Sequence, residues 1–407
     1  MRILQINATY HNPGSTDRIE QDIKRVLECH GHEAFIAHGY DGVVDTDNHI
    51  RGIQGKWQRK WNILKCRLWP RHGFYNISET RKLLRWLDDI KPDLIHIHNI
   101  HNHYVNVKMF FDYIKTHNIP VVWTLHDCWS FTGWCVYFDY AHCNKWINGC
   151  HSCPNKHEYP YTWFFDLSKS NYKLKKRAFL GVDNLLLITP SQWLADLTRK
   201  SFLKEYPVQV VHNGIDTEIF KPCDSDIKLN WGIQGKKMIL AVASGFSKRK
   251  GIDYLIQLPK LLSNNEVLVI VGLLPKQKDL IPQDDRCIAI GRTKNTKELA
   301  CYYSAADVFI NPTLEDNFPT TNIEALACGT PIITFRTGGS VEPVTDDTGI
   351  IVEQGDMNAL IDGIRKIYSS PDKYQASKCV AWVNNFCDKE KQYLRYIDIY
   401  KSLIYGK

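Results

Sequence analysis

Three features of the sequence predict an α/β protein with two doubly wound domains. Short apolar segments alternate with longer amphipathic segments along nearly all of the 407 residues. Such alternation is typical of parallel sheets that carry helices on both faces. The pattern occurs twice, and a less regular region near 205–235 separates the two halves. Apolar residues make up 44% of the chain, which is enough to fill two hydrophobic cores.

The first half contains five predicted strands with predicted helices between them. Each strand is a short run of aliphatic and aromatic residues, whereas each helix repeats its apolar residues every three or four positions. The strands are expected over 2–7, 33–38, 93–98, 119–125 and 184–189. The helices are expected over 16–30, 78–89, 105–117 and 168–180. These elements predict an N-terminal domain over 1–205, with a cysteine-rich insert over 128–157.

The second half repeats this plan and ends in an aromatic-rich helix. Strands are expected over 238–243, 266–272, 287–290, 307–310 and 331–335. Helices are expected over 251–262, 296–304, 320–328, 356–368 and 372–384. These elements predict a C-terminal domain over 206–385. We expect residues 386–407 to form a helix that crosses back to the N-terminal domain.

One basic segment accounts for the whole net charge. Residues 51–71 contain seven cations and no acid, and the chain carries +7 (51 basic minus 44 acidic), so the remainder is formally neutral. Trp57, Trp61, Leu64 and Leu68 fall on one face of a predicted helix in this segment. Such a helix suits an anionic membrane surface or a phosphate-bearing acceptor. The alternative is an ordinary amphipathic helix whose tryptophans lie in the core.

The sequence shows no feature that would direct the chain into or across a membrane. No apolar run approaches the roughly 18–20 residues that a membrane span needs. The start, MRILQINATY, reads as a buried strand and not as a secretory signal. Without an export signal, the thirteen cysteines are more typical of thiols or metal ligands than of disulfides. We therefore expect a cytoplasmic protein, with peripheral contact to the inner membrane face as a possible role of 51–71.

Polar loops follow several of the predicted strands. In open α/β sheets, ligands bind at the carboxyl ends of the strands. We therefore expect the functional residues in the loops over 12–17, 96–103, 126–129, 244–251 and 314–331.

Two acidic residues flank the start of a predicted helix in the last of these loops. Asp316 and Glu324 are eight positions apart, and Thr320 and Thr321 open the helix between them. A helix N-terminus offers unpaired N–H groups and the positive end of the helix dipole, which suits phosphate. Carboxylates at this place can accept hydrogen bonds from sugar hydroxyls. The alternative is a capped helix with a solvated acidic start.

This segment, DNFPTTNIEALACGTPII, resembles the acid-x7-acid signature of the retaining GT-B glycosyltransferases of family 4. The resemblance implies two Rossmann-like domains that face a central cleft. It assigns Glu324 to the nucleotide ribose and Asp316 to the donor sugar, with the amides of Thr320 and Thr321 as further donor contacts. The family's first acid is usually Glu, and here Glu315 is an adjacent candidate for that role.

The loop SGFSKRKGIDYL resembles the basic diphosphate site of the same family. Lys250 matches the family lysine that precedes glycine, and Gly245 occupies the place of the family arginine. We expect Arg249 to supply the second cation. Fixed cations here would stabilise the negative charge that develops on the leaving nucleoside diphosphate. The alternative is a solvated run of surface charges.

The first half carries further matches to the family. Gly14 and Ser15 follow a strand and open a helix, which resembles the family's first phosphate-side loop, although Asp17 stands where glycine is common. His126, in TLHD, matches the family histidine that lies against the donor sugar near the reacting carbon. The loop HIHNIHNH resembles an acceptor-side loop. Its candidate acceptor residues are His98, Asn99 and His101.

Four cysteines have the spacing of a structural zinc site. Cys135, Cys143, Cys150 and Cys153 follow the pattern C-x7-C-x6-C-x2-C. Four thiolates around one tetrahedral zinc leave no open position, so this metal would hold a loop and would not catalyse. The alternatives are free thiols in a packed loop and a disulfide.

The combined motifs predict a retaining glycosyltransferase that moves a sugar from a UDP- or GDP-sugar to a glycan acceptor. The pattern HDxWxFTGxC resembles capsular and colanic-acid-type polysaccharide glycosyltransferases, which implies a surface polysaccharide and a lipid-linked acceptor. The resemblance implies no metal or cofactor for the chemistry. One alternative is a zinc-containing nucleic-acid-binding protein, which the confinement of the positive charge to one helix disfavours; we expect no nucleic-acid partner. Another is a phosphorylase or epimerase of the same fold.

Overall fold

The protein consists of two compact units, which are described separately. The computed structural model describes all residues except 12–13, 41, 44, 46 and 407. The N-terminal unit comprises Met1–Val211 and Gln392–Lys407, and the C-terminal unit comprises His212–Lys391. The division at Val211 lies a few residues beyond the expected boundary at 205/206.

The N-terminal unit is built on a seven-stranded, wholly parallel sheet. Its strand order is β3-β2-β1-β4-β5-β6-β7. The chain order reverses between β1 and β4, so the loops after these two strands meet at a topological switch point. The strands are β1 (Arg2–Asn7), β2 (Glu33–His38), β3 (Ile50–Gly52), β4 (Leu94–Ile97), β5 (Val121–Thr124), β6 (Leu185–Thr189) and β7 (Val208–Val210).

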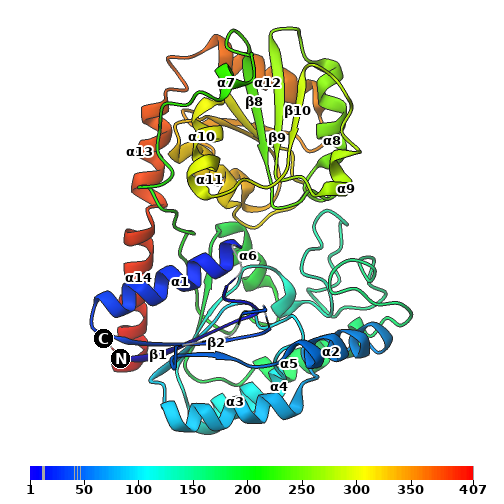
Figure 1. Ribbon diagram of the computed structural model, residues 1–407. Helices are drawn as coiled ribbons and strands as arrows, with labels where there is room; N and C mark the ends of the chain where they lie inside the picture. Colours follow the sequence, from blue (N-terminus) through cyan, green and yellow to red (C-terminus); the bar gives the residue numbers. More distant parts are fainter. Residues whose placement is uncertain (12–13, 41, 44, 46, 407) are drawn as a thin grey trace. The chain divides into compact units, whose positions relative to one another are not determined.

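Helices cover both faces of this sheet because successive strand residues point to opposite sides. Leu4 and Ile6 of β1 belong to the large core under α3, α4 and α5, whereas Ile3 packs with α1 and α14. Figure 1 shows α1 and α14 on one face and α3 and α4 on the other. The helices are α1 (Ser15–Cys29), α2 (Lys56–Leu68), α3 (Ile77–Ile90), α4 (Val107–His117), η1 (Trp129–Phe131), α5 (Ser168–Phe179), α6 (Gln192–Lys200) and α14 (Lys389–Tyr405).

The last helix, α14, completes the core of the N-terminal unit. It starts in the C-terminal unit and continues into the N-terminal one from Gln392. Its Tyr396 hydroxyl lies 3.1 Å from Thr124 Oγ1, and its Tyr400 hydroxyl lies 2.7 Å from His96 Nδ1. These contacts join the end of the chain to the middle strands of the first sheet.

The C-terminal unit repeats the doubly wound plan with six parallel strands. Their order is β10-β9-β8-β11-β12-β13, so the switch point lies between β8 and β11. The strands are β8 (Lys237–Val242), β9 (Glu266–Val271), β10 (Cys287–Ile290), β11 (Val308–Asn311), β12 (Ile332–Phe335) and β13 (Gly349–Val352).

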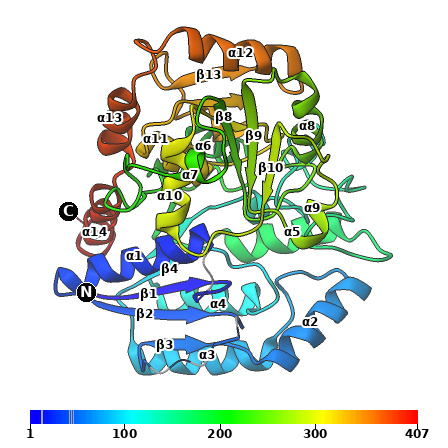
Figure 2. The ribbon, with the colours of Figure 1, turned by 45° about the horizontal axis from the view of Figure 1, so that its top comes forward.

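Each face of the second sheet has its own core. Alternate residues such as Ile332 and Ile333 pack on opposite faces, the first with α10, α11 and α13 and the second with α8 and α12. Figure 2 shows α8 and α10 on opposite sides of β8 and β9. The helices are α7 (Ile227–Asn230), α8 (Ile252–Gln257), η2 (Leu258–Leu261), α9 (Pro275–Lys278), α10 (Thr296–Ala305), α11 (Thr320–Ala327), η3 (Gly338–Val341), α12 (Met357–Ser369) and α13 (Ala376–Phe386).

The basic segment forms the expected helix, but its apolar face is not buried. In α2, Trp57 is 76% exposed and Trp61 is 58% exposed, whereas Asn62 and Cys66 are buried. The interpretation that these tryptophans lie in the core is therefore wrong. Across the described part of the chain, no helix combines the length and the apolar composition needed to cross a bilayer.

Candidate active site

Two loops of the C-terminal unit meet at its switch point. The loop over 243–251 follows β8, and the loop over 312–319 follows β11. The amide of Leu314 donates to the carbonyl of Arg249 at 2.7 Å. Gly251 has φ of 75°, and a Cβ at this position would lie 2.1 Å from the Pro312 carbonyl oxygen. Only glycine therefore permits this close approach of the two loops.

This contact brings together the three expected charged residues. Lys250 Nζ forms an ion pair with Asp316 Oδ2, and Arg249 Nη1 lies 4.0 Å from the same oxygen. Arg249 also donates a hydrogen bond to the carbonyl of Glu315. The Lys250 and Arg249 side chains are 28% and 23% exposed, so a ligand can reach both cations. The structure thus brings Lys250 and Arg249 together beside Asp316.

Asp316 is the acid that faces these cations. Burial raises the pKa of Asp316, but the charges of Lys250 and Arg249 outweigh burial and hold the pKa below its usual value. The adjacent Glu315 is completely buried. Of the two neighbouring acids, only Asp316 combines contact with the cations and residual exposure of its side chain, which is 10%.

The loop leads directly into α11, whose first turn holds Thr320 and Thr321. Both threonines are partly exposed, and no side chain caps the helix start at Pro319. Asn322 ties this turn to the sheet, because it accepts from Asn311 Nδ2 at 2.8 Å and donates to the Ser340 carbonyl at 2.9 Å. The amides at the start of α11 are therefore held in a fixed place, as an anion site requires.

Glu324 lies one turn further along α11 and is more buried than the family role suggests. Glu324 is 2% exposed, and its Oε2 accepts a hydrogen bond from the Tyr303 hydroxyl at 3.0 Å. This bond fixes the carboxylate beneath the helix start. Tyr303 was not among the expected site residues, since no local motif distinguishes it.

In the N-terminal unit, a hydrogen-bonded chain supports His126 at the end of β5. His98 Nε2 lies 3.1 Å from Gln5 Oε1, and His98 Nδ1 lies 3.1 Å from His126 Nε2. The Gln5 amide nitrogen donates to the Glu20 carbonyl, so its oxygen faces His98. His98 therefore carries its proton on Nε2, and His126 donates from its own Nε2 to His98.

Burial keeps these histidines neutral at physiological pH. Burial lowers the pKa of His126 to about 4, although the nearby Asp127 carboxylate partly opposes this shift. The pKa values of His98 and of His96 beneath it are also lowered by burial, well below the usual value. His98 is only 1% exposed, and it lines the base of the pocket beside His126.

His101 and Asn99 lie at the rim of a pocket beside His126. His101 Nε2 lies 2.8 Å from Asp127 Oδ2, and Asp127 Oδ1 accepts the Trp129 amide at 2.8 Å. Burial raises the pKa of Asp127, but the bond and charge of His101 outweigh burial and lower it. The pocket is lined by the loop after β4 and by the end of β5 with the segment that follows it, including Asn99, His101, His126, Asp127, Trp129 and Ser130.

Gly14 and Ser15 form the exposed start of α1. Gly14 has φ of −71°, and no atom lies within 4 Å of where a Cβ would be. Asp17, which replaces a common glycine, points inward, and its Oδ1 accepts from Thr9 Oγ1 at 2.9 Å. Asp17 is 1% exposed, so its carboxylate lies inside the unit and does not cover the start of α1.

The four cysteines of the expected zinc site do not form a tetrahedral set. The Cys135 thiol donates a hydrogen bond to the Cys153 sulfur, and this bond together with burial raises the pKa of Cys135. The Gly133 amide donates to Cys150 Sγ at 3.1 Å. Among the described residues, the one group of three or more metal-ligand atoms within 4.8 Å of one another is His11, His38 and Asp45. All thirteen cysteines, none of them masked, are free thiols, which excludes the disulfide alternative in this structure.

A buried lysine holds the start of the cysteine segment. Lys175 Nζ donates to the carbonyls of Trp129 at 2.7 Å and Thr132 at 3.0 Å, and it lies over the Trp129 ring. Burial lowers its pKa well below the usual value. Sequence reasoning missed Lys175, because a lysine in a lysine-rich helix gives no sign of being buried.

Comparisons with known proteins identify the family. The glycosyl transferases group 1 family matches residues 225–381, and glycosyltransferase family 4 matches residues 22–219. WcaC of Escherichia coli K12, whose name assigns it to colanic acid biosynthesis, is 25% identical over 386 residues, 89% of each chain. CapM of Staphylococcus aureus, a capsular polysaccharide biosynthesis glycosyltransferase, is 26% identical over 212 residues, 48% of this chain and 55% of CapM.

Solved structures with the same fold cover the whole chain. Sucrose-phosphate synthase from Thermosynechococcus elongatus superposes with a TM-score of 0.74 at 18% identity and 100% coverage of both chains. HepE from Anabaena, solved in complex with UDP, superposes with a TM-score of 0.71 at 16% identity, covering 99% of this chain and 100% of HepE. These likenesses show the GT-B fold. The chain belongs to the group 1, family 4 glycosyltransferases, and it is a retaining enzyme that uses a nucleotide-sugar donor.

Proposed function

We propose that this enzyme transfers a sugar from a UDP- or GDP-sugar to a lipid-linked glycan during the synthesis of a surface polysaccharide. The names of WcaC and CapM support the polysaccharide role. The presence of UDP in the HepE complex supports UDP as the nucleotide. The family assignment selects glycosyl transfer among the three activities that the sequence left open.

The ion-paired cluster of Lys250, Arg249 and Asp316 is the observation that carries the proposal. Lys250 and Arg249 hold the diphosphate of the donor, together with the amides of Thr320 and Thr321. As the nucleoside diphosphate leaves, these fixed charges stabilise the negative charge that it gains. Asp316 is connected to Lys250 in the structure. When the donor diphosphate replaces Asp316 as the ion-pair partner of Lys250, Asp316 binds a hydroxyl of the donor sugar.

Glu324 binds the ribose, and His126 lies against the donor sugar. A neutral imidazole suits this place because the reacting sugar carbon gains positive charge in the transition state. An acceptor hydroxyl attacks this carbon as the diphosphate departs, and a donor phosphate oxygen takes the acceptor proton. His101 and Asn99 bind the acceptor, His98 orients His126, and Gly14 and Ser15 lie near the donor phosphate. Family members usually need no metal for this chemistry.

A donor screen tests the proposal. Thermal shifts with UDP, GDP and their sugars should raise Tm for the nucleotide that binds, by mass action. The matching nucleotide sugar should then be turned over, and Glu324→Ala should weaken donor binding roughly tenfold or more, because the ribose hydroxyls lose the carboxylate that accepts their hydrogen bonds. Glu218→Ala, an acid of the C-terminal unit whose side chain is 87% exposed, is the control. Equal donor binding in both variants would contradict the role of Glu324.

We propose that α2 and the aromatic loop beside it contact an anionic membrane. Trp163 N–H donates to the Arg67 carbonyl at 3.0 Å, and the rings of Trp69 and Phe165 lie 5.1 Å apart, so helix and loop form one surface. Cations of α2 lie over the tryptophan rings of the same helix, with Lys60 over Trp57 and Lys65 over Trp61. The exposed aromatic residues of this surface are Trp57, Trp61, Trp69, Tyr161, Trp163, Phe164 and Phe165.

Vesicle flotation tests the membrane contact. The protein should float with phosphatidylglycerol vesicles and not with neutral phosphatidylcholine vesicles, and added salt should weaken binding. The double substitution Trp57→Ser and Trp61→Ser should reduce binding by about tenfold or more, since each exposed tryptophan inserts apolar area. Leu229→Ser, at an exposed position of the C-terminal unit, is the control. Flotation that is indifferent to lipid charge or to the tryptophans would refute the proposal.

For the cysteine segment we propose a structural role only. Cys135 and Cys150 lie in the main core of the N-terminal unit, and Cys143 and Cys153 pack against it. The contacts of Lys175 hold the same segment from below. If thiol packing holds the segment, a chelator should change the Tm of the wild type and of Cys150→Ser by the same amount. If chelation lowers Tm in the wild type and this fall is absent in Cys150→Ser, the cysteine quartet binds a metal and the thiol-packing proposal is wrong.

A further inference from the structure

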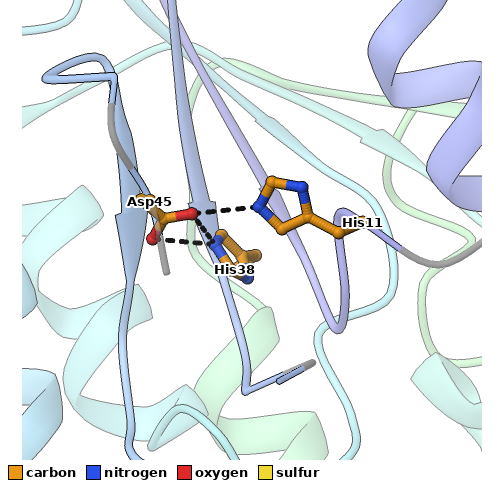
Figure 3. Close-up of side chains that lie close together, drawn as sticks. All are labelled: His11, His38 and Asp45. Carbon is orange, nitrogen blue, oxygen red and sulfur yellow. Dashed lines mark hydrogen bonds and ion pairs between the residues drawn. The ribbon is translucent and has the colours of Figure 1, made fainter. Parts of the chain in front are cut away.

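A second cluster of polar side chains lies at the carboxyl edge of the first sheet. His38 ends β2 opposite Asn7 of β1, His11 lies in the loop after β1, and Asp45 lies in the loop after β2. Figure 3 shows the three side chains pointing toward one another. Asp45 Oδ1 lies 3.1 Å from His11 Nε2 and 3.0 Å from His38 Nε2. The cluster is on the β2 side of β1, whereas His98 and His126 follow strands on its other side.

The hydrogen bonds of His38 point to a cation between it and Asp45. His38 Nδ1 lies 2.6 Å from the carbonyl oxygen of Gly39, which can only accept a hydrogen bond. The proton of a neutral His38 is therefore on Nδ1, and the lone pair of Nε2 faces a carboxylate, which is also an acceptor. The two facing acceptors need a positive charge between them, which either a proton on Nε2 or a metal ion supplies. Histidine ligands of metals typically show this arrangement, with the second ring nitrogen bonded to a backbone carbonyl.

The distances are close to those between metal ligands. Zinc binds imidazole nitrogen and carboxylate oxygen at about 2.0–2.2 Å, so the ligand atoms of a tetrahedral site lie roughly 3.3–3.6 Å apart. The separations of 3.0 and 3.1 Å are a few tenths of an ångström shorter, so small shifts of these side chains would make room for an ion. Asp45 Oδ2 accepts the Gly52 amide at 2.8 Å, which fixes the carboxylate as a backbone contact around a metal ligand does.

The cluster has the composition and exposure of a site with an open position. Two imidazoles and one carboxylate form a ligand set for zinc and related transition metals, whereas magnesium prefers oxygen ligands alone. The His38 side chain is 2% exposed, but those of His11 and Asp45 are 27% and 15% exposed. A bound ion is thus anchored on a buried ligand and remains accessible from the His11 side.

We propose that His11, His38 and Asp45 bind a divalent transition metal ion, of which zinc fits best. The ion joins the loop after β1 to the end of β2 and to the loop that follows it, and it leaves one position for water or for an oxygen ligand. The proposal does not depend on the donor or acceptor assigned above. It also differs from the expected cysteine site, which uses other ligands and another part of the unit.

Metal titration of the full chain, purified without a histidine tag and stripped with chelator, tests the site. Zinc sulfate should bind at one ion per chain, and magnesium chloride should not compete. Cobalt chloride should give weak visible bands without the strong near-ultraviolet thiolate absorption that cysteine ligands produce. Zinc affinity should fall at least tenfold in His38→Ala and in Asp45→Asn, since each loses one of three ligands.

Two controls separate this site from others. His49→Ala removes a histidine close in sequence whose side chain is 45% exposed, and Cys150→Ser with Cys153→Ser disrupts the cysteine quartet; both should keep the wild-type affinity. Equal Tm values of wild type and Asp45→Asn in chelator would show that the fold is retained. The proposal is overturned if the wild type binds no zinc, if His38→Ala and Asp45→Asn bind like wild type, or if cobalt shows thiolate absorption.

Discussion

The two sheets share one strand order around their switch points, yet the loops at their carboxyl edges carry different chemistry. The C-terminal unit places Lys250, Arg249 and Asp316 there, all charged. The N-terminal unit places His98 and His126 there, and burial keeps both neutral. The same scaffold thus provides fixed charge in one unit and neutral hydrogen-bonding groups in the other. Fixed charge suits a diphosphate, and neutral groups suit sugar hydroxyls.

The largest effect on this contrast should come from removing the charge of Lys250. Lys250→Met keeps the length of the side chain but leaves Asp316 without its ion pair and the diphosphate without a cation. We expect kcat/KM for the donor to fall a hundredfold to a thousandfold, about 3–4 kcal/mol. Lys248→Met, an exposed lysine of the same loop, should change kcat/KM less than threefold. Similar kinetics in the two variants would mean that the charged edge does not hold the donor.

A substitution in the backbone between the two loops should have the next largest effect. Gly251→Ala places a Cβ against the Pro312 carbonyl and forces a non-glycine residue to positive φ. We expect a loss of about 2–4 kcal/mol in the free energy of unfolding, seen as a lower Tm. Gly235→Ala, with no atom within 4 Å of its Cβ position, should leave Tm unchanged. A Tm of Gly251→Ala equal to that of this control would show that the two loops are not in contact.

The buried neutral histidines of the N-terminal unit should make its stability depend on pH. The folded-state pKa of His126 is about 4, below its unfolded value, so between about pH 6.5 and 4 the unfolded chain binds a proton that the folded chain does not. Stability should therefore fall as the pH falls through this window, by up to roughly 1.4 kcal/mol per pH unit for each such histidine. His126→Asn should flatten the curve of Tm against pH, and the exposed His117→Asn should not. If the slope of Tm against pH is unchanged in His126→Asn, a group other than His126 causes the pH dependence of stability.

The smallest effect is expected at the start of α1. Gly14→Ala fits the backbone, so the free energy of unfolding should change by less than about 0.5 kcal/mol. If the donor phosphate approaches this turn, the added methyl group should raise KM about threefold, roughly 0.6 kcal/mol. Donor kinetics identical to wild type would remove Gly14 and Ser15 from the donor site.

Much of the fold could be predicted because its central strands are continuous apolar runs. β1 and β2 have the expected bounds, 2–7 and 33–38. The helix expected over 251–262 is divided into α8 and η2, with Pro259 near the start of η2. The short edge strands β3, β7 and β13 were missed, because three or four residues are too few to show a strand pattern of their own.

The site was predictable where residues follow strand ends, and not where distant segments meet. Lys250 and Asp316 each match a motif, but their ion pair depends on the approach of Gly251 to Pro312, which no local pattern indicates. Gly338, with φ of 51°, similarly lets the start of η3 pack against the Asp316 carbonyl, and no local pattern singles it out. The exposed face of α2 shows a related limit, because helical periodicity identifies an apolar face and not its partner.

The placement of α14 has a consequence for the order in which the protein is made. Tyr393, Tyr396 and Tyr400 are buried beside Ile3 and Val122 in the N-terminal unit, yet all of the C-terminal unit precedes them along the chain. A ribosome therefore completes the second sheet before it supplies the last residues of the first core. Until then, one face of the first sheet lacks part of its cover. The first unit to begin folding during synthesis is thus the last to finish.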